Sequence, residues 1–425
     1  MLKKNRGEQG AADAFVLRLG LGGLLVFSVT LVAAGALITA GVMSFHAGAG
    51  NHPVPETSGE PGSEPHLAPK DLPPWGELLT SEIEVERPEE YAAAELGLTN
   101  GPGWVFEHLA PEQVRPLLGA CGLSREQIAR ALSPALMSLT STGTVVRPDE
   151  PLLFSLAPEA RVRLYHDLAR WPVNHYMTYP FCFRGSNITD PFKEIGLGAE
   201  VISKFQRLSY RRGDTTYFSD YETVLQSLHS EPERLAFVKA LSRQRGLLVR
   251  VRIRQDTDID KILSYWGRGL QTKDARPLLE SIKRLQDGGT MSLLYLLPHF
   301  ARERLYTFPL PPRPGEPGID CHWSTMNFFN EPPDDRFAEP TFTVNWLMTN
   351  YYPVAKANLY GDVVLFLNQD GNAIHSGVYL ADDIIFTKNG NNHMQPWMLM
   401  RIKDVLAMYS WANAATLAVY RDKRW

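Results

Sequence analysis

Cys321 and His375 are the residues of this chain whose types and surroundings best suit nucleophilic catalysis. Cys321 follows a Pro- and Gly-rich stretch and Asp320, and it opens a run of residues that can continue as a helix. The partial positive charge at a helix N-terminus lowers the pKa of a thiol and favours the thiolate, which is the nucleophile. We therefore expect Cys321 to be a reactive thiol.

His375 lies in the second of three predicted strands, which short turns would fold into an antiparallel meander. If this sheet packs against the helix that begins at Cys321, the imidazole can reach the sulfur. An imidazole beside a thiol can take its proton and later protonate the leaving group. The three predicted strands cover residues 361–367, 375–380 and 384–388.

A cysteine hydrolase also needs a polar group that fixes the tautomer of the imidazole. Thr387 and Asn389 lie at even spacing from His375 on or just after the neighbouring strand, so both should face its side of the sheet. We choose Asn389, because an amide carbonyl accepts a hydrogen bond from an imidazole N–H. Thr387 remains an alternative, as do Asn391 and His393.

Together these residues resemble the signature of the NlpC/P60 family of papain-like cysteine peptidases. That signature is a Cys after Asp at a helix start, then Gly-Asp before an apolar strand, then H-x-G-[IV]-Y-[LV]. Here it reads Asp320-Cys321, Gly361-Asp362 before VVLF, and HSGVYL from His375. The resemblance implies an α+β papain-like domain over residues 305–425, with an antiparallel sheet and an N-terminal Cys helix. It also implies metal-free cleavage of peptide bonds in peptidoglycan stems.

The resemblance assigns further residues and exposes departures. The family carries a Tyr upstream of the nucleophile that helps to build the site, and Tyr306 is the nearest candidate. His322 and Trp323 stand where the family usually has Ser-Gly, so they are expected to line and reshape the substrate pocket. The family commonly has a His at about the position of Thr387. Residues 331–340 lengthen the link after the Cys helix, as a lid or as a structural insertion.

A membrane anchor is predicted near the N-terminus. Residues 19–43 carry no charge over 25 positions, which exceeds the roughly 20 needed to span a bilayer as a helix. Basic residues within 1–18 place that segment in the cytoplasm by the positive-inside rule. A cleaved signal peptide is the alternative. Residues 44–75 are rich in Pro, Gly and Ser and predict a flexible linker. With the N-terminus in the cytoplasm, the folded parts after the anchor should lie in the periplasm.

Residues 76–304 predict a mostly helical domain of unknown role. Ser124 and Gln127 have the spacing of a capping box before an amphipathic run. One segment, residues 247–254, alternates apolar residues with arginines, which is the pattern of a half-buried strand. These arginines could bind phosphates or wall carboxylates, or they could form a solvated face paired with acidic neighbours.

Composition excludes several classes of function. The formal net charge of −4 provides no basic field of the kind that attracts nucleic acid. The 3 cysteines are widely spaced, so they predict neither a disulfide framework nor a Cys-type zinc site. Cys121 and Cys182 are either a pair or two buried free thiols. His166, His175 and Cys182 lack ligand spacing, so we predict no metal and no cofactor.

The sequence therefore predicts a single-pass inner-membrane protein with a periplasmic cysteine hydrolase domain. The expected substrate is the amide bonds of peptidoglycan stem peptides, cleaved through a thioester on Cys321 with His375 as base and then acid. Two alternatives remain. One is an acyltransferase or transpeptidase on the same site, in which an amine replaces water. The other is a non-catalytic wall-binding or scaffold protein.

Overall fold

The chain has an α+β structure with antiparallel sheets, as predicted. The computed structural model describes residues 73–96, 103–183, 188–213, 215–268, 272–310, 319–409 and 416–425. The predicted cytoplasmic segment, the predicted anchor and the linker up to residue 72 lie outside these residues. Within the described ranges, no helix combines the length and the apolar character that a membrane crossing requires.

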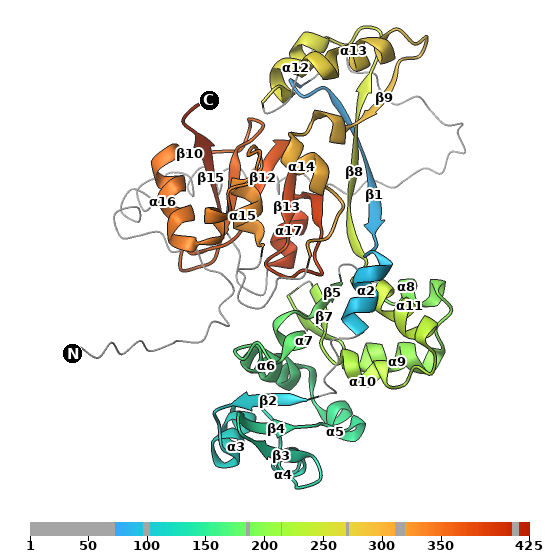
Figure 1. The fold of residues 1–425 in the computed structure, drawn as a ribbon, viewed down its shortest axis with the longest axis vertical. Coiled ribbons are helices and arrows are strands. Elements are labelled where there is room, and N and C mark those ends of the chain that lie inside the picture. The colour runs from blue at the N-terminus through green and yellow to red at the C-terminus, as the bar shows by residue number, and fades with distance from the viewer. Residues whose placement is uncertain are drawn as a thin grey trace, which may run out of the picture.

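A six-stranded antiparallel sheet organises the C-terminal part of the chain (Figure 1). Its strand order is β10-β15-β11-β12-β13-β14, and β11, β12 and β13 form the predicted meander. Every residue of β12 is buried, which reflects its central position. The strands are β10 (Tyr351–Val354), β11 (Val363–Leu367), β12 (Ala373–Ala381), β13 (Ile384–Lys388), β14 (Trp397–Arg401) and β15 (Thr416–Asp422).

Short helices pack on this sheet. Helix α15 (Cys321–Met326) lies against β12 and β13, and α17 (Ile402–Met408) follows β14. The segment after α15 forms η3 (Asp335–Ala338) and α16 (Pro340–Asn350). Phe337 of η3 is buried, and its ring packs on Phe342 at 5.3 Å between centroids. Phe337 thus anchors residues 331–340, most of which are exposed or partly exposed.

Among the described residues between 76 and 304, helices alternate with three small antiparallel sheets, β1-β8-β9, β2-β4-β3 and β5-β7-β6. The sequence analysis predicted β8 but not the other strands of these sheets. Most of those strands have only three or four residues, which is too short for a recognisable periodicity. The strands are β1 (Glu77–Val85), β2 (Trp104–Glu107), β3 (Met137–Thr140), β4 (Gly143–Val146), β5 (Phe181–Phe183), β6 (Tyr210–Arg212), β7 (Thr215–Phe218), β8 (Gln244–Ile253) and β9 (Gly289–Ser292).

The helices of this middle region include α4, whose predicted capping box is confirmed: Ser124 accepts from the Gln127 backbone, and the Gln127 side chain accepts from Ser124. The helices are α2 (Glu89–Leu96), α3 (Pro111–Ala120), α4 (Arg125–Ala131), α5 (Glu150–Ser155), α6 (Pro158–Leu168), α7 (His175–Thr178), α8 (Asp190–Glu194), α9 (Ala199–Leu208), α10 (Tyr221–Leu225), α11 (Glu231–Ser242), α12 (Ile259–Trp266), α13 (Thr272–Lys283), η2 (Leu293–Leu296) and α14 (His299–Arg304).

The arginine-bearing strand is confirmed as β8, which pairs with β1 in a long ribbon (Figure 1). Two of the predicted arginines pair with an acidic residue of β1: Arg252 in β8 lies 3.3 Å from Glu77, and Arg254, just after β8, lies 2.8 Å from the same side chain. The ribbon contacts β14, and a single hydrophobic cluster contains residues of both the middle region and the C-terminal sheet. The two parts therefore share a core.

Candidate functional site

Cys321 is the first residue of α15, as predicted, and it is buried with 3% of its surface exposed. Asp320 caps the helix by accepting a hydrogen bond from the Trp323 backbone at 2.7 Å. Because α15 packs on β12, the Cys321 sulfur accepts a hydrogen bond from the backbone N–H of Ser376. Ser376 is the neighbour of His375, so the fold brings the predicted nucleophile to the strand of the predicted base.

His375 is fully buried, and hydrogen bonds fix its tautomer. Thr387 Oγ1 donates its single hydrogen to the Ser376 carbonyl oxygen at 3.0 Å. It therefore accepts the hydrogen of His375 Nε2, which lies 2.8 Å away. In a neutral imidazole this leaves Nδ1 without hydrogen. Nδ1 is buried and has no hydrogen-bond partner among the residues that the structure describes.

Thr387, and not Asn389, is the residue that orients His375. The Asn389 amide instead donates to Met400 Sδ at 3.3 Å. The reason is that β13 ends at Lys388, so the alternation of faces along the strand no longer holds for the next residue. His393, the other ring considered for this role, lies 3.3 Å from Glu95 instead.

Both predicted catalytic groups are neutral in this structure. Burial raises the pKa of the Cys321 thiol to about 12, and the Asp320 charge raises it as well. Burial also holds the pKa of His375 well below its usual value. The expectation that the helix start lowers the pKa of Cys321 is wrong for this state, because removal from water outweighs the favourable contacts. No hydrogen bond joins the Cys321 sulfur to His375 in the described part of the chain.

Lys388 is a buried cation beside this site that the sequence does not indicate. It is the last residue of β13, has no exposed surface, and its ammonium donates to the carbonyls of Gly390 at 2.8 Å and Asn392 at 3.0 Å. Burial lowers its pKa to about 8, against the opposing charges of Asp320 and Cys321. In the sequence, a Lys that ends a strand is typical of a solvated edge.

Tyr409 covers the imidazole. Its ring stacks on His375 at 4.4 Å between centroids and an interplanar angle of 22°. Burial raises the pKa of its hydroxyl, and the charges of Cys321 and Tyr217 raise it further. Thr215 and Tyr217 of β7 each donate to carbonyls at the end of α17 at 3.5 Å. The middle region thus contacts the end of α17, next to Tyr409.

The three remaining predicted site residues have structural contacts. The Tyr306 hydroxyl donates to the Leu247 carbonyl of β8 at 2.6 Å. His322 Nδ1 lies 3.0 Å from Ser376 Oγ. The Trp323 ring packs on Phe300 at 5.4 Å between centroids. His322 and Trp323 expose 2% and 3% of their surface, so neither lines an open pocket in this structure.

Cys121 and Cys182 are two buried free thiols rather than a pair. The Cys121 sulfur lies 3.5 Å from a carboxylate oxygen of Asp167, and burial raises its pKa to about 12. The Cys182 sulfur accepts a hydrogen bond from Gln395 at 3.1 Å. Cys182 therefore joins β5 to the loop between β13 and β14.

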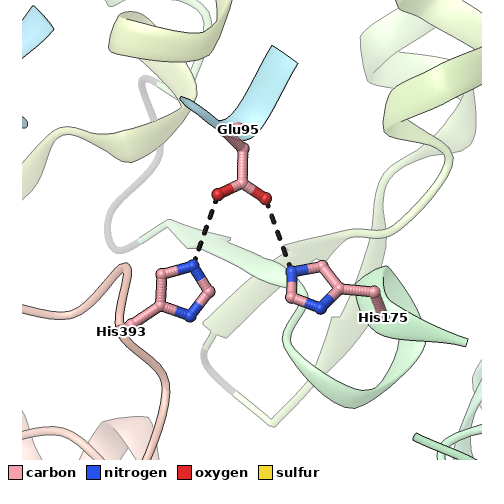
Figure 2. Close-up of side chains that lie close together, drawn as sticks. All are labelled: Glu95, His175 and His393. Atoms are coloured by element: carbon pink, nitrogen blue, oxygen red, sulfur yellow. Dashed lines mark hydrogen bonds and ion pairs between the residues drawn. The ribbon is translucent and has the colours of Figure 1, made fainter. Parts of the chain in front are cut away.

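A second cluster of functional side chains unites Glu95, His175 and His393 (Figure 2). One atom from each of the three lies within 4.8 Å of the others. Glu95 and His393 are buried, and the His175 side chain is 30% exposed. The sequence offers no signal for this cluster, because its members come from three distant segments.

No protein-family model, no curated protein and no solved structure matches this chain. The similarity to the NlpC/P60 signature therefore rests on the residues of the chain alone.

Proposed function

We propose that residues 305–425 form a thiol-dependent amide hydrolase in which Cys321, His375 and Thr387 act together in a papain-like arrangement. The substrate class is the peptide stems of peptidoglycan. The predicted anchor, residues 19–43, would hold the enzyme at the periplasmic face of the inner membrane, where that polymer is found.

The observation that carries the proposal is the state of the two imidazole nitrogens. Nε2 donates a hydrogen bond to Thr387 Oγ1. Nδ1 carries no hydrogen and is buried without a hydrogen-bond partner among the described residues. A thiol hydrolase needs one ring nitrogen held in place and the other free to take the proton of the nucleophile. The Ser376 N–H that binds the Cys321 sulfur lies one residue from this ring.

The proposed reaction follows from these contacts. His375 Nδ1 takes the thiol proton, and the Cys321 sulfur attacks the amide carbonyl carbon. The imidazolium then protonates the leaving amine as the carbon–nitrogen bond breaks, which leaves a thioester. Water activated by the same nitrogen hydrolyses the thioester and restores the thiol. The Cys321 backbone N–H at the start of α15 is the expected donor to the oxyanion.

Catalysis requires an opening of the site. Burial is the largest influence that raises the pKa of Cys321, while the Ser376 N–H and the Lys388 charge lower it. Entry of water and substrate would reduce the effect of burial and leave the favourable contacts, so the thiolate becomes accessible near neutral pH. Tyr409 must leave the face of His375 for this to occur.

A second candidate is favoured by the complete burial of the thiol. A wall-binding or scaffold protein could retain this fold with Cys321 as an inert core residue, because buried thiols with raised pKa values react slowly. A dry site is also compatible with an acyltransferase, in which an amine accepts the acyl group of the thioester.

The test is the release of peptides from purified peptidoglycan by the full chain in detergent, followed by mass spectrometry. We expect release by the native protein and by Cys121→Ser, a matched change of a buried thiol far from the site. Cys321→Ser and His375→Ala should release nothing. Products that appear only with an added amine would favour the acyltransferase.

Alkylation of Cys321 separates an inactive enzyme from a scaffold. Tyr409→Ala should increase the rate of alkylation of Cys321 by iodoacetamide and leave that of Cys121 unchanged. A Cys321 that stays unreactive in Tyr409→Ala, together with no peptide release, would exclude the hydrolase.

A further inference from the structure

Glu95, His175 and His393 converge from three parts of the fold (Figure 2). Glu95 belongs to α2, His175 is the first residue of α7, and His393 lies in the loop between β13 and β14. Two imidazoles and one carboxylate form a ligand set that binds divalent transition metals in proteins.

The spacing of the ligand atoms fits a shared ion. His175 Nε2 lies 3.4 Å from Glu95 Oε1, and His393 Nε2 lies 3.3 Å from Glu95 Oε2. Charge-assisted hydrogen bonds are shorter, about 2.7–2.9 Å. Ligands about 2.0–2.1 Å from a tetrahedral zinc ion are roughly 3.3 Å apart. Each histidine thus lies farther from one carboxylate oxygen than in a strong hydrogen bond, at a distance close to the edge of a zinc tetrahedron. His175 approaches Oε1 and His393 approaches Oε2, so both oxygens of Glu95 face the site.

Buried polar atoms at this place lack partners. Within the described residues, Glu95 Oε1, His175 Nε2 and the Tyr176 hydroxyl are each buried without a hydrogen bond. Unsatisfied buried groups are costly, about 1–3 kcal/mol each, so three in one place indicate a missing common partner.

Arg87 acts on only one oxygen of the carboxylate. Its guanidinium donates to Glu95 Oε2 at 2.9 Å, and both side chains are fully buried. Glu95 Oε1 remains available. Hydrogen bonds of this kind to a ligating carboxylate are typical of the shell around metal ligands and fix the orientation of the carboxylate.

A pocket adjoins the cluster at His175. His175 and Tyr176 line a pocket of about 210 Å³, together with Asp220 of the neighbouring loop. The partly exposed ring of His175 therefore separates this pocket from its own buried Nε2 atom and from Glu95. Glu95 and His393 form the buried side.

We propose that Glu95, His175 and His393 bind one zinc ion. The ion joins α2 and α7 of the middle region to the loop that follows β13 of the C-terminal sheet. This inference does not depend on the proposed thiol chemistry.

The test uses Zn²⁺ itself on the full chain in detergent, after removal of bound metal with a chelator. Zinc content and a titration against a competing chelator give stoichiometry and affinity, and Co²⁺ gives a visible spectrum that reports its ligands. We expect about one zinc per chain in the native protein. His175→Gln, His393→Gln and Glu95→Gln should each lose more than the roughly 10–100-fold in affinity that an outer-shell change costs.

His299→Gln is the matched control. His299, Glu303 and Glu331 form an exposed cluster with the same types of ligand, and His299 Nδ1 already lies 2.6 Å from Glu331. We expect this variant to bind zinc like the native protein. His175→Gln changes a partly exposed side chain, so its metal-free melting temperature should stay near that of the native protein and show that it folds. Native protein that binds zinc no more tightly than the three ligand variants would overturn the proposal and leave a metal-free ion network. Loss of binding in His299→Gln alone would overturn it as well.

Discussion

Replacement of Thr387 by Val tests how the imidazole of His375 is held. Valine has nearly the same shape as threonine but no hydroxyl, so the substitution removes two buried hydrogen bonds. One is from His375 Nε2 at 2.8 Å, and the other is to the Ser376 carbonyl at 3.0 Å. All three residues expose at most 1% of their surface, so water cannot replace the lost partner.

The expected loss of stability follows from these contacts. Each buried group left without a partner costs about 1–3 kcal/mol, so two groups cost about 2–6 kcal/mol. Thr387→Ser is the matched variant: it keeps the hydroxyl and loses one methyl, which costs about 1 kcal/mol. The difference between the two variants is large compared with a typical stability of about 5–15 kcal/mol.

The assay is urea unfolding of the full chain in detergent at pH 7, followed by tryptophan fluorescence, with peptide release measured on the same samples. Thr387→Val should unfold at clearly lower urea than Thr387→Ser. It should also release peptides more slowly, because the imidazole loses its fixed tautomer. Equal midpoints for the two variants would refute the hydrogen-bond network inferred here, whatever the activity.

Three further predictions concern buried groups. The native Cys321 thiol keeps its proton up to a pKa of about 12, while the unfolded thiol loses it near 9. This difference in pKa stabilises the fold fully below pH 9 and progressively less above it. Cys321→Ala should therefore reduce the alkaline decline in the free energy of unfolding, measured by urea titration, by up to about 4 kcal/mol. Gly377→Ala places a Cβ 2.8 Å from the Ile385 side chain and should lower the free energy of unfolding in urea by about 1–3 kcal/mol. Gly198→Ala is the control: its Cβ meets nothing within 4 Å, so this variant should unfold like the native protein. Arg87→Met removes the guanidinium that pairs with the buried carboxylate of Glu95 and should cost about 3–5 kcal/mol without zinc and less with it. A melting temperature equal to that of the native protein would contradict this.

Elements of the C-terminal sheet could be predicted because their signals are local. Alternating and apolar runs separated by turn residues identified the meander of β11, β12 and β13. Asp320 before Cys321 identified the start of α15, because a side-chain cap depends only on neighbours in the chain. These patterns need no knowledge of distant residues.

The choice between Thr387 and Asn389 shows where a local rule stops. Alternation of faces holds only within a strand, and β13 ends one residue before Asn389. The end of a strand is set by what its neighbours pair with, which a single sequence does not reveal. Even spacing from His375 therefore included Thr387 among the candidates but could not choose it over Asn389.

The sequence by itself determined the element order around Cys321 and His375, and with it the type of chemistry that these residues could perform. Only the tertiary structure decided that the thiol is neutral, because its pKa depends on burial where α15 packs against β12 and β13, which lie far from it in the chain. The tertiary structure alone also assembled Glu95, His175 and His393. Contacts between distant segments set burial and the convergence of ligands, whereas sequence patterns report only the few residues within one helix or strand.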